Sequence, residues 1–185
     1  SGGALMEEQA AFDVLHYGLE LEVDPESKSI LGSLTMTARL VEATREIVLQ
    51  LDPSLQVSRV LGGRIQEGEG ELLPLGFQRT GGDIWIGSSE FKVVVEYGGV
   101  PHEAERPPWE GGFTWSEADR QPWIATSCQG EGADLWWPCK DHPSDKPDSM
   151  DLIFTVPEGL VVATNGRRIG SSTLDGKTTS QWRVS

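Results

Sequence analysis

Apolar and polar side chains alternate along the stretch Leu15-His16-Tyr17-Gly18-Leu19-Glu20-Leu21-Glu22-Val23. Because successive side chains of a β-strand point to opposite faces of a sheet, this pattern predicts a strand with one buried and one exposed face. The next residues, Asp24-Pro25-Glu26-Ser27, are typical of a turn, since proline presets φ and small polar side chains cap backbone groups. The alternation then returns over residues 30–40, and the two runs together predict a long hairpin.

Shorter runs of the same kind follow, separated by breaks rich in glycine or proline. The further strands that we expect are 45–51, 55–61, 71–78, 83–87, 90–97, 151–156, 160–165 and 179–184. No segment keeps a 3.6-residue period, and the 22 glycines suit tight turns better than helices. We therefore predict an all-β domain of two packed or strongly curved antiparallel sheets, in the manner of a β-sandwich.

Residues 98–150 interrupt this pattern, because they show little alternation and are rich in tryptophan. A long irregular stretch inside a domain is usually functional or packs against another domain. The alternative is that the indoles simply plug the ends of the sheets.

Length and charge limit the classes of function. We expect residues 1–4 to be a cloning remnant and residues 5–185 to form one domain, which is long enough to bury a core. The formal net charge of −14 argues against nucleic acid as a partner, since phosphate-binding surfaces need Lys and Arg. No run approaches the roughly 18 apolar residues of a membrane span, and no signal-peptide pattern opens the sequence. The compartment is therefore left open.

A search for catalytic and metal-binding motifs finds none. The three histidines are isolated in sequence, and neither H-E-x-x-H nor G-x-S-x-G occurs. Cys139, Asp141 and His142 could be pictured as a ligand cluster, but one loop bracketed by Pro138 and Pro143 rarely presents three ligands to one ion. The two cysteines, Cys128 and Cys139, could pair or could be two buried thiols. We predict no catalytic residue and no metal site.

Residues 126–143 are the most distinctive stretch, since seven of these eighteen residues are Trp, Cys, Pro or His. Together with its surroundings this stretch resembles the amino-terminal domain of the zinc metallo-aminopeptidases of the aminopeptidase N and leukotriene hydrolase type. The matching elements occur in the family's order. They are the hairpin motifs at 16–21 and 30–34, then 47–52, 93–101, 112–115, the Trp-Pro-Cys-Lys-Asp-His-Pro run at 137–143, 156–160 and 163–166.

The resemblance implies a saddle-shaped, mostly antiparallel β domain that packs on a thermolysin-like catalytic domain. In that family the catalytic zinc and its ligands belong to the catalytic domain, and the corresponding motifs are missing from these 185 residues. We therefore expect a non-catalytic domain, truncated before the catalytic domain of a zinc aminopeptidase and inactive alone. Its expected partners are that catalytic domain and peptides with free amino termini.

The resemblance also implies one substrate-binding residue. The family's Thr-Gln-x-Gln/Glu pattern aligns with residues 126–129 and gives Gln129 the role of binding the substrate's α-amine. An ammonium group has only donors, so an amide oxygen is a suitable acceptor. Glu131 is a second, weaker candidate for the same ammonium group. Six further residues are expected to brace the loop: Trp136, Trp137, Pro138, Cys139, Asp141 and Pro143.

The sequence departs from the family pattern at two places. Ser127 stands where the family usually has a second glutamine, and Asp134 and Leu135 stand where an arginine is frequent. The rival interpretation is an independent β-sandwich module whose tryptophans bind peptide or carbohydrate. A purely structural scaffold, in which Gln129 has no role, is a third.

Overall fold

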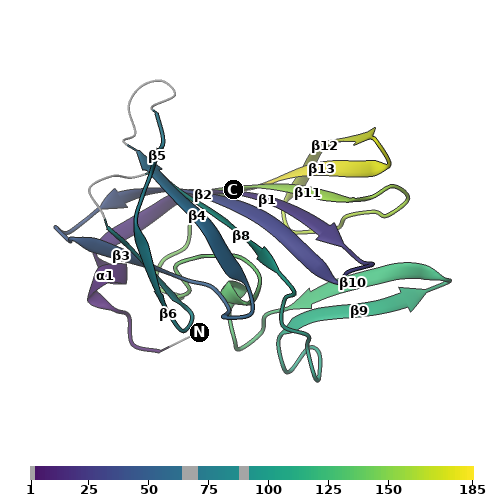
Figure 1. The fold of residues 1–185 in the computed structure, drawn as a ribbon, viewed down its shortest axis with the longest axis horizontal. Coiled ribbons are helices and arrows are strands. Elements are labelled where there is room, and N and C mark those ends of the chain that lie inside the picture. Colours follow the sequence, from purple (N-terminus) through teal and green to yellow (C-terminus); the bar gives the residue numbers. More distant parts are fainter. Residues whose placement is uncertain (1–2, 64–70, 88–91) are drawn as a thin grey trace.

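The computed structural model describes residues 3–63, 71–87 and 92–185, and the regular secondary structure over these ranges is almost entirely β-strand (Figure 1). One sheet has eight strands in the order β12-β13-β11-β1-β2-β8-β4-β5, a second has the order β3-β7-β6, and β9 and β10 form a separate hairpin. The elements are α1 (Glu7–Ala10), β1 (Phe12–Asp24), β2 (Ser29–Leu40), β3 (Glu46–Gln50), β4 (Gln56–Gly63), β5 (Leu73–Pro74), β6 (Phe77–Thr80), β7 (Asp83–Gly87), β8 (Lys92–Gly99), β9 (Gly112–Ala118), β10 (Gln121–Ser127), the 3-10 turn η1 (Ala133–Leu135), β11 (Ser149–Pro157), β12 (Arg167–Leu174) and β13 (Lys177–Val184). The all-β prediction is confirmed.

The predicted hairpin is β1 and β2, paired antiparallel with Leu19 opposite Leu34. Tyr17, Leu19 and Leu21 are buried, as the alternation predicts. Leu15 is only partly buried, because an irregularity between Val14 and His16 shifts the pairing and places Val14 in the core instead. A bulge of this kind adds one residue to a strand and so exchanges its two faces.

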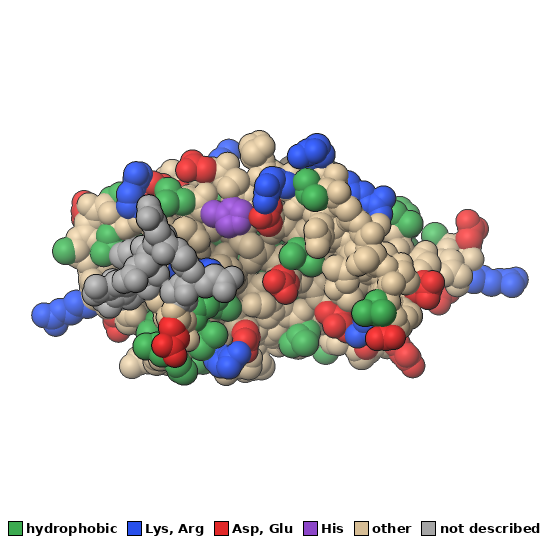
Figure 2. Space-filling view, turned by 90° about the horizontal axis from the view of Figure 1, so that it is seen from above, with side chains coloured by type: hydrophobic (Ala, Val, Ile, Leu, Met, Phe, Trp, Pro, Cys, Tyr) green, Lys and Arg blue, Asp and Glu red, His purple; other side chains and the backbone are tan. Residues whose placement is uncertain are grey.

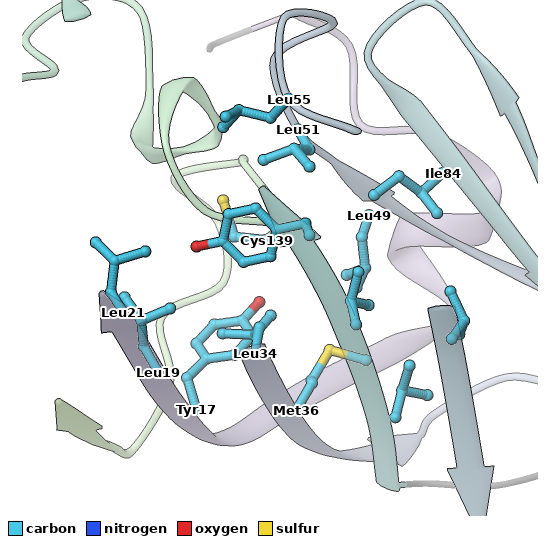
Figure 3. Packing of buried hydrophobic residues seen from close by; sticks show 14 of the residues in the cluster. Tyr17, Leu19, Leu21, Leu34, Met36, Leu49, Leu51, Leu55, Ile84 and Cys139 are labelled. Carbon is cyan, nitrogen blue, oxygen red and sulfur yellow. The ribbon is translucent and has the colours of Figure 1, made fainter. Parts of the chain in front are cut away.

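The core lies between the eight-stranded sheet and the β3-β7-β6 sheet (Figure 3). Leu34 and Met36 from the large sheet face Leu49 and Ile84 from the small one, and all four are at most 1% exposed. Two sheets that bury their apolar faces against each other are the arrangement expected of a sandwich.

The large sheet is mixed rather than wholly antiparallel. β1 pairs in parallel with β11, so that Tyr17 lies opposite Met150 and Leu21 opposite Phe154. A parallel pair needs a long connection between its strands, and here the connection contains most of the chain. Local alternation carries no information about such a distant partner.

The structure corrects two local predictions and adds one strand that was not predicted. The stretch 98–150 contains a regular hairpin, β9–β10, which projects from the body of the molecule (Figure 1). Residues 160–165 do not form a strand, because this extended segment pairs with no neighbour among the described residues, and Val161 is 88% exposed. The strand lies farther on as β12, which joins β13 through a turn at Asp175-Gly176 with positive φ.

Three smaller points concern two of the expected strands and one helix. The expected strand 71–78 is divided into β5 and the start of β6. The first two residues of the expected strand 90–97 lie outside the described residues. The short helix α1 was not predicted; its Gln9 is buried and its amide donates to the Gln50 side chain at 3.0 Å.

One face of the molecule shows acidic and basic side chains interspersed, with hydrophobic atoms in small separate groups (Figure 2). Within the described ranges, no helix has the length and apolar character needed to cross a membrane.

Candidate functional site

The β9–β10 hairpin leads directly into the loop that carries Gln129. β10 ends at Ser127, and Gln129 and Gly130 occupy the turn that follows. Gln129 is exposed, and its side chain makes no hydrogen bond to any described residue. Gly130 has a φ of 83°, a conformation that glycine adopts without strain. The amide of Gln129 is therefore available to a ligand.

Backbone hydrogen bonds fix the far part of this loop to the body of the domain. Cys139 exchanges two bonds with Gln50 of β3, at 3.0 Å and 2.7 Å. The Asp52 N–H donates to the carbonyl oxygen of Asp134 at 2.7 Å. These contacts join the loop to the small sheet, so it is held at two points beyond Gln129.

The adjacent tryptophans of the loop pack against the core. Trp136 lies between Phe113 and Phe154, with ring centroids 6.4 Å away in each case. The rings of Trp137 and Tyr17 are nearly perpendicular, with centroids 5.1 Å apart. The Tyr97 hydroxyl, from the buried side of β8, donates to the carbonyl oxygen of Trp136 at 3.0 Å. Both indoles are therefore packing groups, and neither forms an exposed platform.

Two of the loop carboxylates accept backbone N–H groups. Glu131 accepts from Gly111 at 3.0 Å, and Asp141 accepts from Ala133 at 3.1 Å. The Glu131 carboxylate thus joins the loop to the residue before β9, and the Asp141 carboxylate joins the end of the loop to η1. Glu131 and Gln129 are two residues apart, yet the Glu131 carboxylate is directed to the start of β9.

Asp134 and Asp141 are brought together around Gly132. A Cβ added to Gly132 would lie in steric conflict with carboxylate oxygens of both residues. Burial, reinforced by the nearby Asp141 carboxylate, raises the pKa of Asp134 to about 6. The position at which the family that the sequence resembles often has arginine therefore holds a second carboxylate beside the first, and no local sequence pattern indicates this pairing.

The two cysteines are free thiols. Cys128 is partly buried and accepts a bond from the Trp136 indole N–H at 3.2 Å, whereas Cys139 is buried. Burial raises the pKa of both thiols. The structure therefore contains two separate thiols, which is one of the two alternatives left open above.

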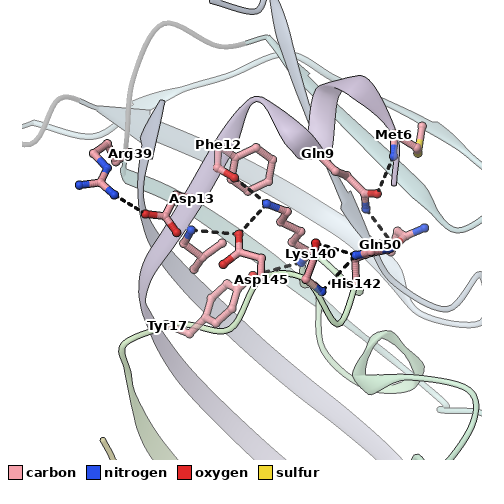
Figure 4. Close-up of polar contacts among 12 residues, drawn as sticks. Met6, Gln9, Phe12, Asp13, Tyr17, Arg39, Gln50, Lys140, His142 and Asp145 are labelled. Atoms are coloured by element: carbon pink, nitrogen blue, oxygen red, sulfur yellow. Dashed lines mark hydrogen bonds and ion pairs between the residues drawn. The ribbon is translucent and has the colours of Figure 1, made fainter. Parts of the chain in front are cut away.

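A buried ion pair that the sequence analysis did not identify lies beside the loop (Figure 4). The Lys140 ammonium and the Asp145 carboxylate are 2.5 Å apart, and their side chains are only 4% and 8% exposed. Lys140 also donates to the carbonyl oxygen of Phe12 at 2.6 Å, while Asp145 accepts the N–H of Val14 at 3.2 Å. The pair therefore fastens the end of the loop to the first strand of the large sheet.

A hollow of about 250 Å³ opens next to this ion pair, with Tyr17, Trp137 and Asp141 in its wall. Gln129 is not part of this wall among the residues that the structure describes. No group of three His, Cys, Asp or Glu side chains in the described ranges has an arrangement that could hold a metal ion. Pro138 and Pro143 stand on either side of the buried Lys140 in the sequence.

Comparison with known proteins identifies relatives by structure. No protein-family model matches the sequence, and no curated protein matches it. An M1 zinc metallopeptidase from Deinococcus radiodurans, bound to a Tyr-Ser-Ala substrate, is similar to this chain with a TM-score of 0.74 and 22% sequence identity. The match covers 94% of this chain and 39% of the peptidase.

Yeast LTA4 hydrolase in complex with bestatin is also similar, with a TM-score of 0.65 and 20% identity. This match covers 93% of the chain but 26% of the hydrolase, so the chain spans about a quarter to two fifths of the length of these two proteins. The resemblance expected from the order of the sequence motifs is thus confirmed at the level of the fold, and the chain has an all-β fold that M1 zinc metallopeptidases and LTA4 hydrolase contain as one part of a longer chain.

Proposed function

We propose that this chain is the non-catalytic β domain of a zinc aminopeptidase and that Gln129 binds the free amino terminus of the peptide substrate. The catalytic zinc would belong to the parent's catalytic domain, on which this domain would pack. The proposal rests on the relatives, which are named as zinc metallopeptidases and of which the chain matches only a part. The single observation that supports the residue assignment is the exposed, unpartnered amide of Gln129 on a braced loop.

The chemistry of Gln129 suits this role. Its amide oxygen can accept a hydrogen bond from an ammonium group, and its position in a turn leaves the amide clear of the domain. Binding the amine at a fixed point measures where a peptide begins, which restricts a peptidase to the terminal bond. Glu131 is the less suitable candidate, because its carboxylate already accepts the Gly111 N–H.

The decisive experiment introduces Gln129→Ala into the full-length parent enzyme and measures kcat/KM of the variant and the parent on two matched substrates. We expect kcat/KM for a peptide with a free amino terminus to fall about ten- to a hundredfold, the range for losing a hydrogen bond to a charged group. Residual activity on the same peptide with an acetylated amino terminus should not change. Gln129→Glu should retain activity, since a carboxylate also accepts from an ammonium group.

Gln121→Ala is the matched control, because Gln121 is an exposed glutamine at the other end of β10. Equal losses at Gln121 and Gln129, or an unchanged rate in Gln129→Ala, would refute the assignment. The 185-residue chain alone, supplied with zinc, is expected to show no turnover of either peptide. Turnover by the chain alone would contradict the non-catalytic role.

The rival function, a module that binds carbohydrate through aromatic stacking, has one observation in its favour. Trp109 and Trp123 are 76% and 60% exposed. Titration with oligosaccharides, followed by quenching of tryptophan fluorescence, tests it. Quenching that disappears in Trp123→Ala would favour the rival over the peptidase role.

A further inference from the structure

A second, larger hollow is lined by residues of the β9–β10 hairpin and of the turn that joins β1 to β2. Figure 1 shows where these two segments lie in the fold. Its volume is about 490 Å³, within the range of sites that hold small molecules or short peptides. The floor is apolar, with Trp115 and Ile124 paired across the hairpin. Pro25, Pro122 and Pro157 complete it. We call this hollow the hairpin groove.

The rim of the hairpin groove is acidic. Asp24 and Glu26 from the turn and Glu117 from β9 contribute three carboxylates, against one cation, Lys28. The Lys28 ammonium is already 3.2 Å from Glu103, which lies outside the groove. The groove therefore presents a net negative charge to solvent.

The Asp24 carboxylate remains ionised at neutral pH. The Ser27 hydroxyl donates to it at 2.6 Å and the Glu26 N–H at 2.9 Å, and these bonds lower its pKa. The positive charge of Lys177 also lowers the pKa of Asp24, but the Lys177 ammonium is paired with Glu22. No described basic side chain makes an ion pair with Glu26 or Glu117.

Trp115 contributes its ring to the floor of the groove. The indole Nε1 of Trp115 is buried and has no partner among the described residues. The ring itself is fixed, because it stacks on Phe113 with centroids 5.1 Å apart. The Trp115 ring lines the groove while its N–H is buried, so the apolar ring is what this residue presents to a ligand.

We propose that the hairpin groove binds a short extended peptide carrying Lys or Arg. The cationic side chain lies among Glu26, Glu117 and Asp24. The apolar floor packs against the aliphatic stem of the basic side chain. This site is separate from Gln129 and does not depend on its proposed role.

Titration followed by NMR tests the proposal on the 185-residue chain. The probe is acetyl-Ala-Lys-Ala-amide, whose blocked amino terminus excludes recognition of a free amine. The readout is the indole N–H resonance of Trp115, assigned by its disappearance in Trp115→Phe. We expect a saturable shift of this resonance with the lysine peptide, because the ligand packs against the Trp115 ring, and none with acetyl-Ala-Glu-Ala-amide.

The double variant Glu26→Gln/Glu117→Gln should weaken binding of the lysine peptide about three- to tenfold, as expected for losing two exposed charge interactions. Glu42→Gln/Glu46→Gln is the matched control, since it removes two exposed carboxylates on another part of the surface and should leave the affinity unchanged. Salt at 0.5 M should weaken binding by screening the rim. Equal affinity for the two peptides, an unchanged affinity in Glu26→Gln/Glu117→Gln, or no shift at millimolar peptide would overturn the proposal.

Discussion

The buried pair of Lys140 and Asp145 predicts a large loss of stability when one partner is removed. The Asp145 side chain is only 8% exposed, so Lys140→Met would leave a buried carboxylate without its cation. The carbonyl oxygen of Phe12 would also lose its donor. Breaking a buried ion pair from one side costs about 3–5 kcal/mol. For a domain of this size each kcal/mol lowers Tm by about 2–4 °C, so a decrease on the order of 10 °C is expected.

Urea unfolding followed by circular dichroism at pH 7 measures this free energy, and a double-mutant cycle separates the pair from its surroundings. Asp145→Asn keeps an acceptor for the Val14 N–H, so Lys140→Met/Asp145→Asn removes the charges together. We expect the double variant to lose less than the sum of the single losses, by about 2 kcal/mol or more. Lys177→Met is the control, because its pair with Glu22 is exposed and should contribute about 0–1 kcal/mol.

Two results would refute this reasoning. One is a loss in Lys140→Met no larger than that in the control. The other is strict additivity in the double variant, which would mean that the two charges do not interact despite their 2.5 Å separation.

Two further predictions concern ionisable groups of the loop. The pKa of Asp134 is about 6 in the folded chain against an ordinary 3.8, so the folded state binds this proton more tightly and stability should fall as pH rises from about 4 to about 6. Asp134→Asn should therefore be more stable than the parent at pH 7, by about 1 kcal/mol after allowance for partial exposure. Thermal melts at pH 4 should show no difference in stability between the two. An equal difference at both pH values would contradict the assignment. The buried Cys139 should resist a thiol reagent such as DTNB in the native chain while Cys128 reacts slowly, and both should react in urea; rapid labelling of two thiols without denaturant would show that the packing around Cys139 is wrong.

The hairpin of β1 and β2 could be predicted because its strands bury one face each, which the alternation from Tyr17 to Val23 records directly. β9 and β10 could not be predicted in the same way, since only Gly112 and Phe113 of the two strands are buried and neither strand has one buried face. Their turn is also unusual: Asp119 and Arg120 both have positive φ, where the common hairpin turn places glycine. By contrast, Asp175-Gly176 is a standard hairpin signal, and it would have located β12.

The site shows the same division. Trp136 and Trp137 pack as bracing residues of the loop, whereas the role of Gln129 came only from the resemblance. The carboxylate pair at Asp134 and Asp141 depends on a close approach across Gly132, which the sequence does not encode in any local pattern. The Lys140–Asp145 pair depends on burial by β1, more than a hundred residues earlier in the chain.

The parallel pairing of β1 with β11 has a consequence for synthesis of the chain. Tyr17 meets Met150, so 133 residues separate the partners. At about 5–20 residues per second, the ribosome needs roughly 7–27 s to make that interval. Throughout this time one edge of the nascent β1 has no native partner and can pair with the wrong strand. The domain therefore has a high contact order, and its completion waits for β11, however early the first hairpin forms.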